Sequence, residues 1–217
     1  MRVYHFVNRK YGLQNIRRRR LKVATINELN DPFELLSIAP KVPEVRQAYE
    51  RTKSGLAKNR GLLCFSRNWR NPVQWSHYAD RHRGLCLGFD VTAELTPVTY
   101  TSKRLKPDIE AIEAGGAAAQ DHMRKMLTTK FSHWRYENEL RIFVKLNTKD
   151  RMTGLYFVHF SKKVALREII IGQNSTISQA ELRRALGSKA DGVEIYKAQL
   201  AFQTFRVVRQ KLDRLWE

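Results

Sequence analysis

Residues 134–144 read Trp-Arg-Tyr-Glu-Asn-Glu-Leu-Arg-Ile-Phe-Val and carry the clearest alternating pattern in the chain. A β-strand points successive side chains to opposite faces, so this pattern predicts one long strand over residues 134–146. Its apolar residues then share one face, and its polar face carries Glu137, Glu139 and Arg141. Neighbouring like charges on one strand face repel and destabilise an ordinary half-buried strand. We therefore interpret this face as a candidate catalytic site, with an arginine beside the two carboxylates.

Short apolar or alternating runs predict further strands on both sides of this segment, with helical spacing between some of them. The pair Gly115-Gly116 is a weak point in the longest helical stretch. Ser178 and Glu181 stand at the N-cap and N3 positions of a capping box. The predicted strands, besides the first, are residues 3–7, 21–26, 62–65, 85–91, 98–101, 155–160, 166–171, 192–199 and 202–208. The predicted helices are residues 11–20, 41–58, 73–81, 106–130 and 178–186.

The order of these elements predicts an α+β fold, because strands outnumber helices and do not alternate regularly with them. A length of 217 residues predicts a single domain, residues 1–217, with a helical insertion at about residues 104–130. The chain has no glycine-rich phosphate-binding loop, which argues against Rossmann and P-loop nucleotide sites.

The cysteines and the apolar runs indicate in which cellular compartment the protein is expected. Cys64 and Cys86 both lie in apolar, strand-like runs and show no metal-binding spacing, so we expect free thiols in a cytoplasmic protein. The N-terminus lacks the apolar core of a signal peptide. No stretch approaches the roughly 18 apolar residues of a membrane span, so we expect no membrane insertion.

The charge is strongly positive, with 40 Lys and Arg against 21 Asp and Glu and a net charge of +19. Such an excess favours an anionic partner, which is most often nucleic acid and otherwise an acidic protein or membrane surface. Residues 1–27 carry eight basic residues and no acidic one. A generally basic surface without a specific partner is the alternative interpretation. The basic sets are Arg17, Arg18, Arg19 and Arg20; Arg60, Arg67, Arg70, Arg81 and Arg83; and Arg206, Arg209, Lys211 and Arg214.

Three more clusters carry side chains suited to binding a ligand. They are Tyr4-His5 in a predicted strand, Asn30-Asp31 before a proline, and the segment from Ser66 to Tyr78. Each also has a structural interpretation, because a lone strand histidine is often structural and Asn-Asp-Pro is a turn signature. Aromatic residues three apart on a helix share a face and often belong to the core.

Taken in order, the motifs of these clusters resemble a widespread bacterial family of unknown function. The resemblance covers residues 4–172, and the family by itself implies no activity. The motifs are Asn-Asp-Pro-Phe-Glu from residue 30, Cys-Phe-Ser from residue 64, Trp-Ser-His-Tyr-Ala-Asp-x-His-x-Gly-Leu-Cys-Leu-Gly-Phe-Asp from residue 75, and Trp-x-Tyr-Glu-x-Glu-x-Arg from residue 134.

More distantly, the chain resembles the ADP-ribosyltransferase fold, and most of all its DNA-targeting toxins. The shared features are a first strand with His5, a short helix, a central aromatic segment and a late strand that opens with Glu139. The resemblance implies a split, mixed or antiparallel sheet flanked by helices, with NAD as substrate. It implies that His5 holds NAD and that Tyr78 stacks on nicotinamide. The residues implied on the NAD side are Tyr4, His5, Arg9, Asn30, Asp31, Ser66, Tyr78 and Arg141.

The same resemblance implies that Glu139 is the catalytic carboxylate. Breaking the bond between nicotinamide and ribose creates an oxocarbenium-like cation, which a fixed carboxylate stabilises. Glu137 would accept a proton from the acceptor, and repulsion between two carboxylates in one cleft raises one pKa. Arg141 or Arg9 would pair with the pyrophosphate. The doubled glutamate and the Asn30–Glu34 motif depart from the toxins, which leaves open which carboxylate is essential.

Two other functions remain open at this point. A metal-dependent nuclease could bind Mg²⁺ through Asp31, Glu34, Glu137 and Glu139. A non-catalytic basic module could bind RNA, DNA or an acidic partner, with its glutamates merely ion-paired.

Under the enzyme interpretation, the acceptor would be RNA or DNA. The likeness to toxins implies a role in phage defence or a toxin–antitoxin pair, with an acidic antitoxin. The residues expected to contact nucleic acid are Arg17, Arg18, Arg19, Arg20, Arg67 and Arg70.

Overall fold

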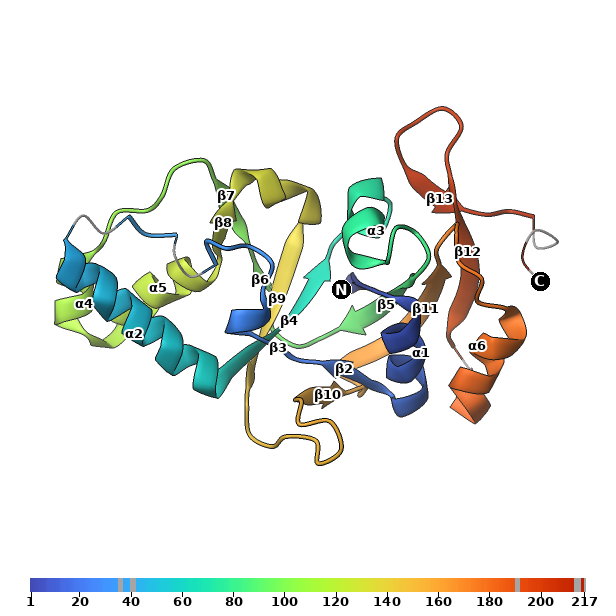
Figure 1. Cartoon of the computed structure of the whole chain (residues 1–217), viewed down its shortest axis with the longest axis horizontal. Helices are drawn as coiled ribbons and strands as arrows, with labels where there is room; N and C mark the ends of the chain where they lie inside the picture. The colour runs from blue at the N-terminus through green and yellow to red at the C-terminus, as the bar shows by residue number, and fades with distance from the viewer. Residues whose placement is uncertain (35–36, 40–41, 190–191, 213–215, 217) are drawn as a thin grey trace.

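A mixed β-sheet crosses the whole molecule and supports both of its larger hydrophobic clusters (Figure 1). The computed structural model describes residues 1–34, 37–39, 42–189, 192–212 and 216. Within these residues the main sheet has nine strands. In spatial order they are β13 (Val207–Arg209), β12 (Glu194–Leu200), β11 (Val164–Ile171), β5 (Leu85–Val91), β1 (Arg2–Val7), β4 (Arg60–Ser66), β9 (Glu139–Lys145) and β6 (Thr96–Pro97), while β3 (Ala24–Thr25) pairs with β4.

Only β11 and β12 pair in parallel in this sheet, as far as the described residues show, and the other neighbours are antiparallel. The prediction of an α+β fold with a mixed sheet flanked by helices is therefore confirmed. Two small sheets lie beside the main one. They join β10 (Phe157–His159) to β2 (Arg20–Lys22) and β7 (Thr99–Thr101) to β8 (Thr129–Phe131).

Helices cover both faces of the sheet because its central strands are apolar on both sides. Leu85, Leu87 and Phe89 of β5 join one cluster, and Cys86 between them joins the opposite one. The first cluster includes α1 (Arg9–Arg18) and α6 (Gln179–Leu186), and the second includes α3 (Pro72–Tyr78). No helix among the described residues is long and apolar enough to cross a membrane.

A group of three helices, with a small cluster of its own, lies at the far end of the sheet (Figure 1). They are α2 (Pro43–Asn59), α4 (Ile109–Ala114) and α5 (Gly116–Leu127). The break between α4 and α5 falls at Gly115, which adopts φ 65°. This agrees with the predicted weak point in the helical stretch 106–130, although the helix itself ends at Leu127.

The sheet opens between β1 and β4. β1 pairs with β5 along its whole length, Arg2–Val7, but with β4 at one position only, Tyr4 opposite Ser66. Next to that position, Nδ1 of His5 lies 3.1 Å from the carbonyl oxygen of Cys64, so a side chain replaces the backbone ladder. Because regular pairing stops there, the two strands leave space between them for a ligand.

The predicted strand over residues 134–146 is wrong in its first half. Residues Ser132–Glu137 form the 3₁₀-helix η2, Asn138 adopts a left-handed conformation (φ 45°, ψ 52°), and β9 begins only at Glu139. Asparagine tolerates this conformation better than most residues, since its short polar side chain bonds locally. Glu137 and Glu139 therefore do not share a strand face.

Four other predictions need correction or a limit. The strand predicted over residues 21–26 is divided into β2, β3 and the 3₁₀-helix η1 (Ile26–Glu28). The strand predicted over residues 202–208 is regular only in β13, and the preceding loop is bent. Of the predicted helix 41–58, residue 41 lies outside the described part of the chain, as does Arg214 of the C-terminal basic set. Ser178 is confirmed as the N-cap of α6.

Gly84, at the turn from α3 into β5, allows a close backbone approach. A Cβ atom there would lie 2.2 Å from the carbonyl oxygen of Val7. We expect Gly84→Ala to lower the free energy of unfolding by about 1–3 kcal/mol, because the backbone must shift. Gly55 in α2 has no atom within 4 Å of such a Cβ, so Gly55→Ala should stabilise by about 0.5–1 kcal/mol. Urea unfolding followed by circular dichroism measures both, and equal stability of Gly84→Ala and the parent would contradict the close approach.

Candidate functional site

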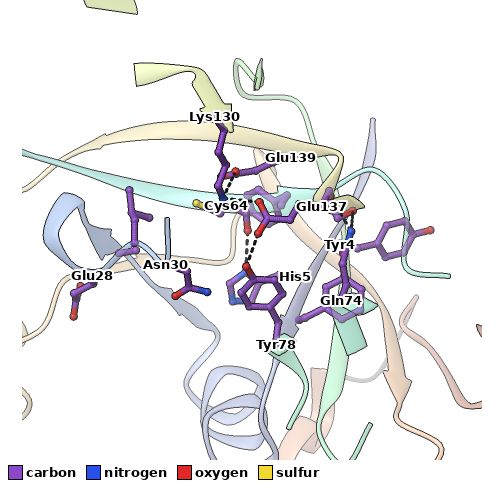
Figure 2. Close-up of a pocket in the computed structure, with 15 residues that line it drawn as sticks. Tyr4, His5, Glu28, Asn30, Cys64, Gln74, Tyr78, Lys130, Glu137 and Glu139 are labelled. Atoms are coloured by element: carbon purple, nitrogen blue, oxygen red, sulfur yellow. Dashed lines mark hydrogen bonds and ion pairs between the residues drawn. The ribbon is translucent and has the colours of Figure 1, made fainter. Parts of the chain in front are cut away.

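A cavity of about 220 Å³ lies where β1 and β4 separate (Figure 2). Its wall combines side chains from both strands with the turn after η1, the helix α3, the strand β8 and the η2–β9 turn. Most of the surface is apolar, and Tyr78, Lys130 and Glu137 form a connected polar group within it. The lining residues are Tyr4, His5, Phe6, Ala24, Glu28, Leu29, Asn30, Cys64, Phe65, Ser66, Gln74, Tyr78, Lys130, Glu137 and Glu139.

Helix α3 brings Tyr78 into the cavity. The helix starts at Asn71, whose side chain accepts a hydrogen bond from the backbone N–H of Val73, and Pro72 fits the first helical position. Trp75, one turn before Tyr78, is fully buried and donates to the carbonyl of Trp69. This buried anchor fixes the helix, so the hydroxyl of Tyr78 reaches Glu137 and donates to its Oε1 (Figure 2).

Gln74 fixes the η2–β9 turn against the end of β4. Its Nε2 lies 3.1 Å from Oγ of Ser66, 2.6 Å from the carbonyl oxygen of Tyr136 and 2.9 Å from that of Glu137. A buried amide with this many acceptors holds a turn rigidly, since an unpaired buried carbonyl is costly. The turn therefore presents Glu137 to the cavity in a defined position.

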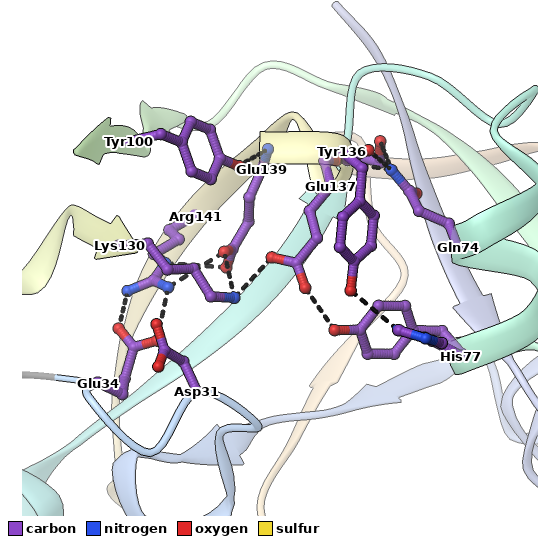
Figure 3. Close-up of polar contacts among 12 residues, drawn as sticks. Asp31, Glu34, Gln74, His77, Tyr100, Lys130, Tyr136, Glu137, Glu139 and Arg141 are labelled. Carbon is purple, nitrogen blue, oxygen red and sulfur yellow. Dashed lines mark hydrogen bonds and ion pairs between the residues drawn. The ribbon is translucent and has the colours of Figure 1, made fainter. Parts of the chain in front are cut away.

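Lys130 links the two carboxylates of this turn. Its Nζ lies 2.6 Å from Oε2 of Glu137 and 3.3 Å from Oε2 of Glu139, and all three side chains are buried. Although Glu137 and Glu139 leave different backbone elements, they converge on one cation (Figure 3). The expected proximity of the two carboxylates is thus present, but it comes from the turn and from Lys130.

Arg141 locks Glu139 in place from β9. Nε and Nη2 of Arg141 lie 2.9 Å and 3.1 Å from the two carboxylate oxygens of Glu139. On its other side the guanidinium pairs with both oxygens of Glu34, at 2.5 Å and 3.0 Å. Such fork-to-fork pairs are strong and directional. The chain Glu34–Arg141–Glu139–Lys130–Glu137 is a continuous buried ion network (Figure 3).

This network drives the two carboxylates apart in pKa. For Glu139, burial alone would raise the pKa, but the charges of Arg141 and Lys130 outweigh it and lower the pKa to about 2. For Glu137, burial raises the pKa, and the nearby negative charge of Glu139 adds to this against the opposing charge of Lys130. Glu139 is therefore a permanent anion, whereas Glu137 is suited to accept a proton.

The low pKa of Glu139 predicts a pH-dependent contribution to stability. A carboxylate whose folded pKa lies below its unfolded value stabilises the fold above the unfolded value and loses this contribution as the pH falls. The shift from 4.5 to about 2 corresponds to about 3 kcal/mol. We expect the difference in unfolding free energy between the parent and Glu139→Gln to be constant above pH 4.5 and to shrink toward pH 2. Urea titrations at several pH values measure this difference in unfolding free energy. A difference that does not change with pH would contradict the low pKa of Glu139.

His5 stands at the opening of the sheet with a defined tautomer. Because the carbonyl oxygen of Cys64 can only accept, Nδ1 of His5 carries the proton and Nε2 remains an acceptor. Burial lowers the pKa of His5, which keeps the ring neutral. Tyr4, Asn30 and Ser66 also line the cavity, so the structure gathers most of the residues expected on the NAD side.

Three residues expected on the NAD side do not line this cavity. Arg141 is 1% exposed, and its guanidinium is occupied by Glu34 and Glu139, so it holds the carboxylate rather than a phosphate. Arg9 forms a bidentate pair with Glu181 at 2.8 Å and 2.9 Å. Asp31 is buried, and its Oδ1 accepts from the backbone N–H of Phe33, as in an Asx turn.

Of the arginines expected to contact nucleic acid, some are exposed and others are held by neighbouring side chains. Arg17, Arg18, Arg67 and Arg70 are exposed. Arg20 is not available, because it is buried, lies 2.5 Å from Asp150 and stacks on Phe157 at 3.6 Å. The guanidinium of Arg19 lies over the ring of Phe160 at 5.5 Å. Of the run Arg17–Arg20, Arg17 and Arg18 are therefore the exposed cations.

No pattern in the sequence indicated that two residues of the site would lie there. Lys130 lies at the end of the Ala-rich stretch and looks like any helix-terminal lysine until β8 turns it inward. Gln74 lies in the aromatic helix, where only its burial distinguishes it. The turn at Asn138 did leave a signal, because asparagine is disfavoured inside strands and common in left-handed turns.

The acidic cluster expected for a metal-dependent nuclease is arranged differently. Glu34, Glu137 and Glu139 face Arg141 and Lys130. No group of three or more His, Cys, Asp and Glu side chains is placed to hold a metal ion in the part of the chain that the structure describes. The geometry gives the nuclease interpretation no support.

Comparison with known proteins identifies one similarity. Residues 74–142, about a third of the chain, match the model of a family described as "Protein of unknown function (DUF2971)". Neither curated proteins nor solved structures gave a match. The matched segment runs from α3 through β5, α4 and α5 into β9, and it contains Tyr78, Lys130, Glu137, Glu139 and Arg141. The part of the chain that carries four of the five members of the ion network, all but Glu34, is thus similar to a family of unknown function.

Proposed function

We propose that this protein is an NAD-dependent ADP-ribosyltransferase that modifies nucleic acid. The observation that carries the proposal is that His5, Tyr78, Glu137 and Glu139 line one cavity at the opening of the sheet. Three separate segments of the chain supply these residues: His5 comes from β1, Tyr78 from α3, and Glu137 and Glu139 from the two sides of the η2–β9 turn. Their convergence was expected from the resemblance to ADP-ribosyltransferases.

The cavity has a size and chemistry suited to one end of the dinucleotide. Sites for whole drug-sized ligands usually enclose about 300–1,000 Å³, so about 220 Å³ suits the nicotinamide ring and its ribose. The ring of Tyr78 provides an aromatic surface, and Nε2 of His5 can accept from a hydroxyl. A neighbouring open hollow shares Tyr78 and is also lined by Asn8, Arg9, Lys10, Leu13, His77 and Asp80. We assign the phosphates to this hollow, with Arg9 and Lys10 in place of Arg141.

Glu139 would stabilise the charge that develops during the reaction. The bond between nicotinamide and the ribose C1′ breaks, and its electron pair leaves with nicotinamide. Positive charge then grows on the ribose. An ionised carboxylate fixed by the protein stabilises that charge without reorganising, and the pKa of about 2 keeps Glu139 ionised. Arg141 and Lys130 hold it in place.

Glu137 would activate the acceptor. The nucleophilic atom of the acceptor forms the new bond to C1′, and its proton passes to the carboxylate of Glu137. A raised pKa makes a carboxylate a better base, and burial raises the pKa of Glu137. The hydroxyl of Tyr78 and Nζ of Lys130 orient it.

A nucleic-acid acceptor follows from the charge of the chain. The net charge of +19 opposes binding of cations and favours polyphosphates. Arg67 and Arg135 line an open groove that also reaches Glu139, on the far side of the η2–β9 turn. Modification of nucleic acid would be toxic to a cell, so we extend the proposal to phage defence or a toxin–antitoxin pair with an acidic antitoxin.

Incubation with NAD labelled in its adenylate part tests the proposal. Separate reactions contain single-stranded DNA, RNA or a protein mixture, each with and without EDTA. We expect the label to enter a nucleic acid in the presence of EDTA, with release of nicotinamide. Degradation of the nucleic acid that needs Mg²⁺ and ignores NAD would instead support a nuclease.

A further inference from the structure

The loop between β12 and β13 projects away from the rest of the molecule (Figure 1). It carries two exposed aromatic rings. Phe202 is 98% exposed and Phe205 is 99% exposed. The loop is closed at its base, where the backbone N–H of Ala201 donates to the carbonyl of Arg206 at 2.9 Å. Large apolar side chains with this exposure at a defined tip mark a contact surface.

The base of this hairpin is tied firmly to the segment 67–71. The backbone N–H of Val207 donates to the carbonyl of Arg70 at 2.9 Å, and Trp69 meets Tyr196 edge-on with ring centroids 5.8 Å apart. Trp69 and Tyr196 are both buried. The tip is therefore held by a rigid support rather than by a loose tail.

The surroundings of the tip are basic. Residues 195–212 contain four basic residues and no acidic one, although Arg209 among them pairs with Glu194. The segment 67–78 contains two arginines and no acidic residue. Arg70 and Arg206 are exposed close to the hairpin. A ligand that is both flat and anionic complements this combination, since bases stack on aromatic rings and phosphates bind arginine.

The same segment connects the hairpin to the candidate site. Arg67, Asn68 and Asn71 line the open groove that reaches Glu139, while their neighbours Trp69 and Arg70 support the hairpin. A strand of nucleic acid that contacts the tip can thus follow exposed arginines toward the groove at Glu139. An apolar membrane-binding tip needs no such path.

We infer that the β12–β13 hairpin binds single-stranded nucleic acid, with Phe202 and Phe205 stacking on unpaired bases and Arg70 and Arg206 contacting phosphates. This inference rests on the proposed function for its choice of nucleic acid over other anionic partners. The hairpin lies outside the cavity and would position the acceptor without taking part in cleavage of NAD.

Fluorescence anisotropy with labelled single-stranded DNA and RNA oligonucleotides tests the inference. Stacking contributes about 1–3 kcal/mol per base, so the double variant Phe202→Ser, Phe205→Ser should bind at least about tenfold more weakly. The double variant Phe202→Tyr, Phe205→Tyr keeps both rings and should stay within about threefold of the parent. Met152→Ser, which removes an 85% exposed side chain from another loop, is the matched control and should change nothing.

Three results would overturn the inference: unchanged binding by the double serine variant, no oligonucleotide binding by the parent, or hairpin-dependent binding only to vesicles of phosphatidylserine and phosphatidylcholine. Nicotinamide release without an acceptor, measured on the same proteins, separates this inference from the proposed function. If no variant or parent releases nicotinamide but oligonucleotide binding still depends on the two rings, the proposed function fails and the hairpin assignment stands.

Discussion

Glu139→Gln is expected to reduce the release of nicotinamide from NAD by at least about 100-fold, because removal of one fixed group that stabilises developing charge costs about 10²–10³ in rate. The substitution keeps the size of the side chain and removes its charge. Nicotinamide is quantified by liquid chromatography at saturating NAD. Circular dichroism must show a folded protein, since Glu139 also pairs with Arg141 and Lys130.

Glu137→Gln is the matched comparison for this prediction. If Glu137 acts as the base toward the acceptor, nicotinamide release in the absence of acceptor should fall by less than about tenfold, while transfer to nucleic acid falls by about 10²–10⁴. Transfer by the parent should also rise with pH through the raised pKa of Glu137. Full activity of folded Glu139→Gln would refute the role of Glu139. If Glu137→Gln instead shows the loss of nicotinamide release predicted for Glu139→Gln, Glu137 would be the carboxylate that stabilises the developing charge.

Arg141→Met is expected to cost about 3–5 kcal/mol of unfolding free energy, the second large effect. The guanidinium is buried between Glu34 and Glu139, and removing one partner of a buried ion pair leaves uncompensated charge. Methionine fills much of the same volume, so the loss measures charge rather than packing. Urea unfolding at neutral pH measures the change.

A double-mutant cycle distinguishes the network from a general loss of packing. If Glu34 and Arg141 interact as the structure shows, Glu34→Gln combined with Arg141→Met should cost clearly less than the sum of the single substitutions. Arg183→Met, at an exposed position of α6, should stay within about 0.5 kcal/mol of the parent. Additive effects in the cycle would contradict the buried pair.

The regular elements around the site were predictable because their patterns are local. The strand 85–91 matches β5, and Ser178 begins α6, since apolar runs and capping residues act within a few positions. The alternation of β9 also holds from Glu139 onward, with Leu140 in the core and Arg141 on the opposite, polar face beside Glu139. These features depend on neighbours in sequence.

The site depended on contacts that the sequence does not display. The same alternating pattern that predicts β9 also extends across Tyr136 and Glu137, and only the left-handed turn at Asn138 breaks it. Lys130 approaches the carboxylates because β8 pairs with β7, an interaction between distant segments. Glu34 could be chosen as a charged residue in a motif, but its partner Arg141 lies 107 positions away. The contacts that hold Glu137 and Glu139 in place therefore became visible only in the structure.

The most direct test of the central claim is the release of nicotinamide by the purified protein given NAD alone, followed over time in the presence of EDTA. The account predicts steady release by the parent, with Glu139→Gln at least about 100-fold slower. It also predicts that Arg17→Ala, at an exposed position that does not line the cavity, matches the parent. No release by the folded parent, with or without nucleic acid, would contradict the claim that this cavity cleaves NAD.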